Sequence, residues 1–208
     1  MKALSFFYLK VLVLSLSGCS AVLSAPTSDI LPLPELLETL QAGGHIIYMR
    51  HAKTDHTQKG EDHQNLLDCA RQRNLSAEGV KQAKRVGEML SLHRIPVGDV
   101  FSSPYCRCKD TAKLVFGHYK VKPELGFSIS KDARESEQLG GLLYEMMVNA
   151  RDKEKNTVFV GHTSNLRDGL GVWPKPEGVI AVFSIKNGVP VFRGMIRPDD
   201  WSMAQEAP

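Results

Sequence analysis

The chain has 208 residues, which is enough for one domain with a sizeable hydrophobic core. Its formal net charge of +3 at pH 7 is small for this length, so charge excludes a typical nucleic-acid-binding protein.

The first 18 residues have the features of an export signal. Lys2 and Lys10 precede an apolar run at residues 11–17 that is too short to span a membrane stably. The following Leu-Ser-Gly-Cys resembles a lipoprotein processing box, so Cys19 is expected to become a lipidated first residue. We predict a signal peptide over residues 1–18, a Ser-, Pro- and Leu-rich tether over 19–34 and a folded domain over 35–208. The protein is then expected on the periplasmic face of a bacterial membrane, or soluble in the periplasm.

The first predicted strand leads into the first candidate functional pair. A short helix is expected over residues 35–41, and the apolar run at residues 46–49 predicts a buried strand. Arg50 and His51 then lie at its carboxyl end, where open α/β sheets bind ligands. A buried arginine requires an anion, and a neutral histidine beside it can act as a nucleophile. Phosphate fits both residues, although an ion-paired arginine beside a core histidine gives the same short pattern.

A long polar loop is predicted between the first strand and the next helix, over residues 52–74, at the mouth of a pocket. Lys53, His56, Arg71 and Arg73 in this loop either touch a substrate or face water. The His and Asp residues here have no compact metal-binding spacing, so no metal site is predicted.

Two further strands deliver candidate residues to the same edge. A helix over residues 77–92, capped by Ser76, is followed by a strand at 97–101 and by a helix from Pro104 to Gly117 with Arg107 in its first turn. There the helix dipole also favours phosphate. An extended segment is expected over residues 121–130, and a strand over 157–160 ends before His162.

The last predicted elements form an edge of the sheet. Residues 179–185 and 189–196 are β-rich runs separated by Lys-Asn-Gly, which is a strong hairpin turn.

Three motifs together resemble the histidine phosphatase superfamily, which includes phosphoglycerate mutases, acid phosphatases and phosphohistidine phosphatases. They are Arg50-His51-Ala52, Ser102-Ser103-Pro104 with Arg107, and Gly161-His162, in the family's order. The resemblance covers about residues 46 to 201 and implies an α/β fold, a three-layer α/β/α sandwich with a mostly parallel central sheet and an antiparallel edge hairpin. Ala52 stands where glycine is usual in the family, so the identity of the substrate cannot be inferred directly from the family's other members.

The resemblance implies a metal-independent phosphoryl transfer without a cofactor. His51 is expected to attack phosphorus, while Arg50, Arg107 and His162 hold the phosphoryl oxygens. The leaving oxygen needs a proton donor, and Glu135, followed shortly by Gly-Gly, is similar to the acid segment of the mutase-like branch. Glu137 is the alternative donor.

Further side chains are expected around this site. Lys53, His56 and Asn165 are candidate substrate contacts, and Asn165 is also a candidate for capping the helix that follows His162. Cys69, Cys106 and Cys108 remain after lipidation of Cys19, and export permits a disulfide. We expect Cys69 and Cys106 to be bonded at the pocket rim, against the alternative of three free thiols.

Export favours a substrate outside the inner membrane. The sequence predicts a phosphomonoester hydrolase that acts on a phosphorylated small molecule or an envelope sugar phosphate, including a glycolipid, with the membrane as a partner through the lipid anchor. A non-catalytic envelope lipoprotein that binds phosphorylated ligands and a phosphohistidine protein phosphatase remain as alternatives.

Overall fold

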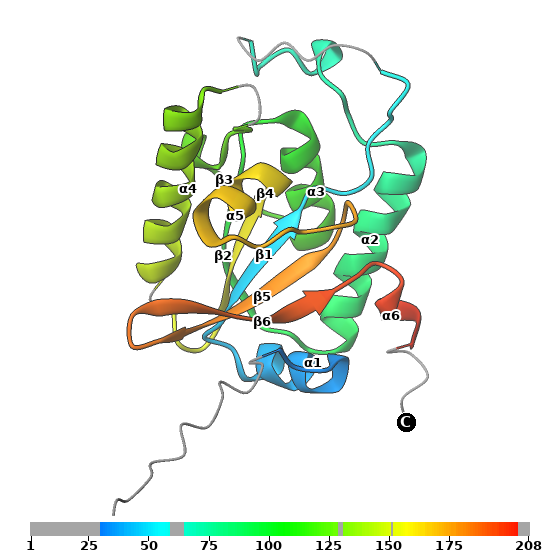
Figure 1. The fold of residues 1–208 in the computed structure, drawn as a ribbon. Coiled ribbons are helices and arrows are strands. Elements are labelled where there is room, and N and C mark those ends of the chain that lie inside the picture. Colours follow the sequence, from blue (N-terminus) through cyan, green and yellow to red (C-terminus); the bar gives the residue numbers. More distant parts are fainter. Residues whose placement is uncertain (1–29, 59–64, 129–130, 151, 204–208) are drawn as a thin grey trace, which may run out of the picture.

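The computed structural model describes residues 30–58, 65–128, 131–150 and 152–203. Within them lies one six-stranded sheet with the strand order β3-β2-β4-β1-β5-β6 (Figure 1). The strands are β1 (Ile46–Arg50), β2 (Val97–Ser102), β3 (Lys120–Val121), β4 (Asn156–Gly161), β5 (Ile180–Lys186) and β6 (Val189–Ile196). The helices are α1 (Leu33–Ala42), α2 (Ala77–Leu92), α3 (Cys106–Phe116), α4 (Ala133–Val148), α5 (Thr163–Leu170) and α6 (Asp200–Met203), with 3-10 turns η1 (Cys69–Arg71) and η2 (Pro123–Leu125).

The sheet is parallel on one side of β1 and antiparallel on the other. β4 runs parallel to β1 and β2, whereas β5 pairs antiparallel with both β1 and β6. Arg50 is in register with Gly161. The carboxyl ends of β1, β2 and β4 therefore meet at one edge, as the sequence predicted.

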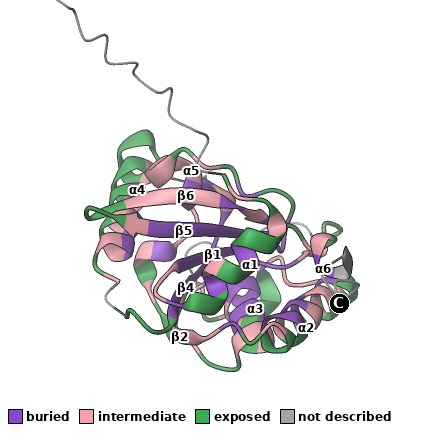
Figure 2. Ribbon diagram, turned by 90° about the horizontal axis from the view of Figure 1, so that it is seen from below, coloured by how far each residue is buried: buried purple, intermediate pink, exposed green. Residues whose placement is uncertain are grey.

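Helices cover both faces of the sheet, which gives the predicted three layers (Figure 1). Alternate residues of a strand point to opposite faces. Ile47 and Met49 of β1 pack in a core that includes residues of α1, α2 and α3, while Ile46 and Tyr48 pack in a core with residues of α4 and α5. Figure 2 shows the central strands buried between the helices.

Most predicted elements have the expected bounds, with two differences near prolines. Helix α2 spans residues 77–92, and the Ser76 hydroxyl accepts a hydrogen bond from the Gly79 N–H at 3.0 Å. Helix α3 begins at Cys106, two residues after Pro104. An extended segment is expected over residues 121–130, and in its described part, residues 121–128, only Val121 of β3 is in a strand, because Pro123 has no N–H to donate and begins a 3-10 turn instead.

The folded domain begins slightly before residue 35. Helix α1 starts at Leu33, and the Leu31 N–H donates to the Arg193 carbonyl oxygen of β6 at 2.7 Å. The predicted signal peptide, the lipidation residue Cys19 and most of the tether lie outside the described residues. Of the helices in residues 30–58, 65–128, 131–150 and 152–203, none combines the length and the apolar character needed to cross a membrane.

Candidate active site

Four side chains predicted from three strand ends meet at the carboxyl edge of the sheet. Arg50 ends β1 and His51 follows it, Arg107 lies in the first turn of α3 after β2, and His162 directly follows β4. The ring centroids of His51 and His162 are 5.5 Å apart, and Arg107 Nη2 lies 3.3 Å from His162 Nδ1. The predicted convergence of two imidazoles and a guanidinium is therefore present.

The His51 ring is held so that one particular nitrogen can react. Its Nδ1 lies 2.9 Å from the Ala52 carbonyl oxygen, which can only accept, so Nδ1 carries the proton and Nε2 carries the lone pair. Burial, followed by the positive charge of Arg107, lowers the pKa of His51 well below its ordinary value. The imidazole is neutral near pH 7, which is the state that a nucleophile requires.

The backbone of His51 is bonded on both sides. Its N–H donates to the Gly161 carbonyl oxygen at 3.1 Å, and its carbonyl oxygen accepts from the Gly178 N–H at 2.9 Å. The neighbouring Arg50 N–H donates to the Val179 carbonyl oxygen at 3.1 Å. These bonds tie the candidate nucleophile to the strand ends of both β4 and β5.

The second imidazole, His162, is also buried and neutral. Arg107 can only donate, so His162 Nδ1 accepts, and the proton on Nε2 is donated to Ser103 Oγ at 2.9 Å. Burial and the charge of Arg107 lower the pKa of His162 well below its ordinary value. The rings of Tyr105 and Phe127 contact both partners: they lie 5.0 and 5.1 Å from the His162 ring and 4.6 and 5.4 Å from Arg107 Cζ.

A buried side chain closely approaches the backbone of Gly161. A Cβ atom at this position would lie 2.4 Å from the Tyr48 hydroxyl oxygen. That hydroxyl donates to the His162 carbonyl oxygen at 2.7 Å. The Gly-His order of the third motif thus leaves room for the buried tyrosine that fixes the His162 backbone.

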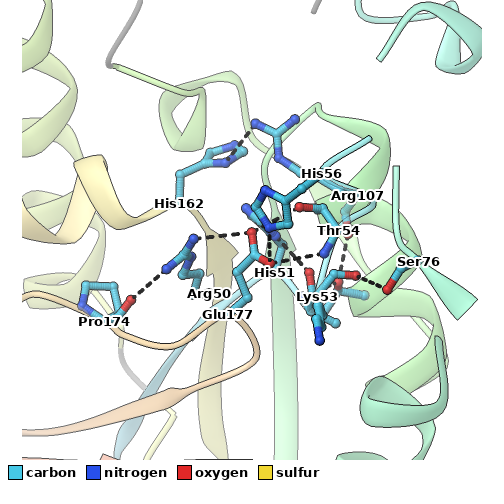
Figure 3. Close-up of polar contacts among 12 residues, drawn as sticks. Arg50, His51, Lys53, Thr54, His56, Ser76, Arg107, His162, Pro174 and Glu177 are labelled. Carbon is cyan, nitrogen blue, oxygen red and sulfur yellow. Dashed lines mark hydrogen bonds and ion pairs between the residues drawn. The ribbon is translucent and has the colours of Figure 1, made fainter. Parts of the chain in front are cut away.

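Arg50 is held by the segment between α5 and β5. Its Nη1 donates to the Pro174 carbonyl oxygen at 3.4 Å, and its Nη2 donates to Glu177 Oε1 at 3.3 Å (Figure 3). The Arg50 Nε atom is buried and has no hydrogen-bond partner in the part of the chain that the structure describes. A phosphoryl oxygen is a suitable acceptor for such a guanidinium.

Sequence reasoning missed Glu177, which is central to the polar contacts in Figure 3. Its side chain is only 9% exposed, and it accepts hydrogen bonds from the Thr54 N–H at 3.1 Å and the Thr54 hydroxyl at 3.0 Å. His56 Nε2 lies 3.3 Å from Glu177 Oε2. Neither a periodic pattern nor a motif marks Glu177, and its partners lie more than a hundred positions earlier in the chain.

Arg73 adds a third arginine to the surroundings of the site. Its positive charge contributes to the lowered pKa values of both His51 and His162, after burial and Arg107. The sequence placed Arg73 in the polar loop at the pocket mouth, and the structure brings it near enough to act on both imidazoles.

The other predicted substrate contacts lie elsewhere or have other partners. The Lys53 ammonium forms an ion pair with Glu78 Oε2 of α2 at 2.5 Å. Asn165 is buried, and its Nδ2 donates to the Gly126 carbonyl oxygen at 2.6 Å. Helix α5 has His162 and not Asn165 as its N-cap residue. His56 is the candidate contact that the structure links to Arg50, through Glu177.

The predicted proton donor Glu135 is on the surface. It lies in the first turn of α4, its side chain is 53% exposed, and its carboxylate is 3.6 Å from the Lys131 ammonium. Glu137 is also exposed and lines a surface hollow with Ser128, the residue after Phe127. No contact among the described residues joins either glutamate to His51 or His162, and their role stays a prediction.

A disulfide between Cys69 and Cys106 fixes the polar loop beside Arg107, with a Cα–Cα distance of 5.7 Å. This is the pairing expected from the sequence. Gln72 supports it, because its side chain accepts from the Cys106 N–H at 3.0 Å and donates to the Leu66 carbonyl oxygen at 3.1 Å. The third thiol, Cys108, is free and buried.

Reduction of the disulfide is expected to lower the free energy of unfolding by up to about 4 kcal/mol, because the bond closes a long loop in the unfolded chain. The sequence separation of the two cysteines is 37. Thermal unfolding with and without reductant measures the effect, and a double Cys69→Ser, Cys106→Ser variant should match the reduced protein. An unchanged melting temperature, or three reactive thiols in the unfolded, unreduced protein, would contradict it.

Acidification is expected to destabilise the fold through His51 and His162. Their pKa values are lowered in the folded protein, so below about pH 6.5 the unfolded chain binds protons that the folded chain does not. The free energy of unfolding should therefore decrease as the pH is lowered, by up to about 1.4 kcal/mol per pH unit for each histidine.

Urea unfolding across this pH range tests the expectation. A His51→Ala variant should lose part of the slope, whereas His118→Gln, at an exposed histidine, should keep it. Equal slopes in all three proteins would show that the buried imidazoles do not remain neutral.

Comparison with known proteins agrees with this geometry. Residues 46–137 match the model of the histidine phosphatase superfamily (branch 1). No curated protein sequence matches the chain.

Solved structures share the fold. The protein histidine phosphatase SixA complexed with tungstate is 18% identical, with a TM-score of 0.52 over 75% of this chain and 98% of that chain. A phosphoserine phosphatase from Entamoeba histolytica in complex with phosphoserine is 16% identical, with a TM-score of 0.56 over 75% and 98%. The alpha-ribazole phosphatase from Shigella flexneri is 16% identical, with a TM-score of 0.54 over 74% and 96%. The family model matches the part of the chain that contains Arg50, His51 and Arg107, and the similar structures show the shared fold.

Proposed function

We propose that this protein is a phosphomonoester hydrolase that forms a phosphohistidine at His51. The chain has the fold of the histidine phosphatase superfamily and matches its branch 1 model over residues 46–137. One observation carries the proposal: the unprotonated Nε2 of a buried, neutral His51 lies beside the Arg107–His162 pair. A nucleophile without its own proton next to fixed positive charge is suited to attack on a phosphoryl group.

The cations and His162 have the role of holding the phosphoryl oxygens. Arg107 is fully buried against the rings of Tyr105 and Phe127 and is fixed before a ligand arrives, and Arg50 is held by Pro174 and Glu177. Preorganised donors of this kind stabilise the charge that spreads over the oxygens during transfer. Water then hydrolyses the phosphohistidine, and the scheme requires neither a metal ion nor an organic cofactor.

The substrate class is proposed as an extracytoplasmic phosphorylated small molecule or an envelope sugar phosphate. Two of the similar structures are a phosphoserine phosphatase and an alpha-ribazole phosphatase by name. The predicted signal peptide and lipidation residue support export, and so does the disulfide, because such bonds persist in oxidising compartments.

The proposed membrane anchor depends on Cys19. A Cys19→Ala variant is expected to leave the membrane fraction and to lack the added lipid mass, while its phosphatase activity stays that of the parent. Cell fractionation and intact-mass measurement check this. A variant that stays in the membrane fraction would refute the lipoprotein assignment and leave the proposed chemistry unaffected.

A search for the phosphohistidine tests the proposed chemistry. The purified full chain is mixed briefly with aryl phosphates, sugar phosphates, phosphoserine or a phosphohistidine peptide, and its intact mass is measured after rapid quenching. An acid-labile phosphoryl adduct on His51 is expected, and the substrate that forms it fastest identifies the class. If the protein binds phosphate but forms no adduct and releases phosphate from none of the substrates, a non-catalytic binding lipoprotein would be favoured. Fastest transfer from the phosphohistidine peptide would favour a protein phosphatase.

A further inference from the structure

The departing oxygen needs a proton donor, for which the sequence predicted a single carboxylate. The structure instead places a histidine-carboxylate pair, His56 and Glu177, near the site. Glu135 and Glu137 are exposed, and Glu135 is paired with Lys131. Among the described residues, Glu177 is the one buried Asp or Glu side chain, and it contacts His56. The side chain of His56 is 63% exposed, so this pair has one buried member and one open member.

The carboxylate of Glu177 has a fixed position between the phosphate-binding side and His56. Figure 3 shows Arg50 on one side of it and Thr54 and His56 on the other. Oε1 accepts from Arg50 Nη2 at 3.3 Å and from the Thr54 hydroxyl at 3.0 Å, and Oε2 accepts from the Thr54 N–H at 3.1 Å. A single carboxylate therefore connects the arginine that would hold the phosphoryl group to the imidazole of His56.

This arrangement determines which nitrogen of His56 can face a substrate. Nε2 is 3.3 Å from Glu177 Oε2, and a carboxylate can only accept, so Nε2 donates to Glu177. Nδ1 is then the nitrogen available to a ligand. A carboxylate that fixes the tautomer and orientation of an imidazole is a common support for acid-base catalysis.

We propose that His56, oriented by Glu177, donates the proton to the leaving oxygen and later accepts a proton from the attacking water. The inference rests on the proposed function at His51. In the first step the His51 Nε2–P bond forms and the bond from phosphorus to the leaving oxygen breaks. The oxygen keeps the electron pair and takes the proton from Nδ1 of the His56 imidazolium, which becomes neutral.

The second step restores both histidines. Water attacks phosphorus, the His51 Nε2–P bond breaks, and one proton of the water passes to Nδ1 of neutral His56. Phosphate is released, His51 is neutral again and His56 is again an imidazolium. His56 is thus a catalytic residue in this scheme, whereas Glu177 is a positioning residue that acts through His56 and Arg50.

A pair of aryl phosphates separates proton donation from a structural role. Nitrophenolate leaves 4-nitrophenyl phosphate as a stable anion, whereas phenyl phosphate has the same overall shape and a more basic leaving oxygen. The quantity to compare is kcat/KM, because it reports the steps up to departure of the leaving group and not the later hydrolysis.

The His56→Gln variant is expected to lose about a hundredfold or more in kcat/KM on phenyl phosphate, the usual contribution of a general acid, and to change little on 4-nitrophenyl phosphate. Glu177→Gln should lower kcat/KM on both substrates, because it also releases Arg50. The loss should be larger on phenyl phosphate, because His56 is then no longer oriented. Glu145→Gln and His118→Gln, at exposed positions, serve as matched controls and should behave as the parent. Glu135→Gln, at the donor that the sequence predicted, tests the rival assignment.

Three results would overturn the inference: equal losses of His56→Gln on both substrates, no loss on either, or a selective loss in Glu135→Gln. Retained activity of His56→Gln on 4-nitrophenyl phosphate shows that the variant is folded and that the His51 chemistry is intact. Failure of the proposed function itself is distinguishable, because the parent would then hydrolyse neither ester and form no adduct.

Discussion

Replacement of His51 by alanine is expected to abolish turnover, with a loss in kcat of roughly three orders of magnitude or more, as happens when an enzyme loses its nucleophile. The physical reason is the position of Nε2, since the proton on Nδ1 is bound to the Ala52 carbonyl oxygen. His162 cannot replace it, because its Nδ1 lone pair accepts from Arg107 and its Nε2 carries the proton, so neither nitrogen offers a lone pair for attack.

The measurement is phosphate release together with the intact mass of quenched protein. The His51→Ala variant should show no phosphoryl adduct yet still bind inorganic phosphate, since Arg50, Arg107 and His162 remain. His118→Gln is the matched control at an exposed histidine and should behave as the parent. Activity equal to the parent, or an adduct that persists in His51→Ala, would refute His51 as the nucleophile.

Substitution of Arg107 by lysine should cost about a hundredfold to a thousandfold in kcat/KM, the scale for losing one preorganised donor to a developing charge. The change keeps the positive charge but removes the planar guanidinium, which lies over the Tyr105 ring at 4.6 Å and reaches His162 Nδ1. An ammonium group cannot contact His162 and a phosphoryl group in the same fixed geometry.

Steady-state kinetics on 4-nitrophenyl phosphate and urea unfolding of the same samples test this expectation. The unfolding curve shows whether a loss of rate reflects a loss of fold. Arg134→Lys, at an exposed position of α4, is the matched control and should have no effect. An Arg107→Lys protein within a factor of about two of the parent would show that charge alone suffices, contrary to the role of preorganised donors.

The sequence predicted the sheet well, because its most buried strands, β1, β4 and β5, are short and mainly apolar. The runs at residues 97–101 and 157–160 correspond to β2 and β4, and the turn at residues 186–188 joins β5 to β6. Strand ends could therefore be placed, and with them Arg50, His51, Arg107 and His162. The residues at the ends of these strands are close to them along the chain, so their place in the fold could be predicted from one sequence.

The surroundings of the site were harder to predict, because they depend on contacts between distant segments. Glu177 lies in an irregular connection between α5 and β5, and its contacts with Thr54 and His56 cross more than a hundred positions. The resemblance predicted Glu135 as the acid, and no pattern in the sequence indicates whether that carboxylate is buried. Likewise, no feature of the sequence indicated that the Lys53 ammonium would form an ion pair with Glu78.

The backbone bonds on both sides of His51 have a consequence for the evolution of substrate choice. Its N–H and carbonyl groups are hydrogen-bonded to Gly161 at the end of β4 and to Gly178 just before β5, so the residue that carries the attacking nitrogen is anchored to the sheet. The loop that contains His56 and Cys69 is joined to that frame by side-chain contacts and one disulfide. Changes in the length or composition of this loop can therefore redirect the enzyme to another ester while the bond-breaking geometry is inherited unaltered.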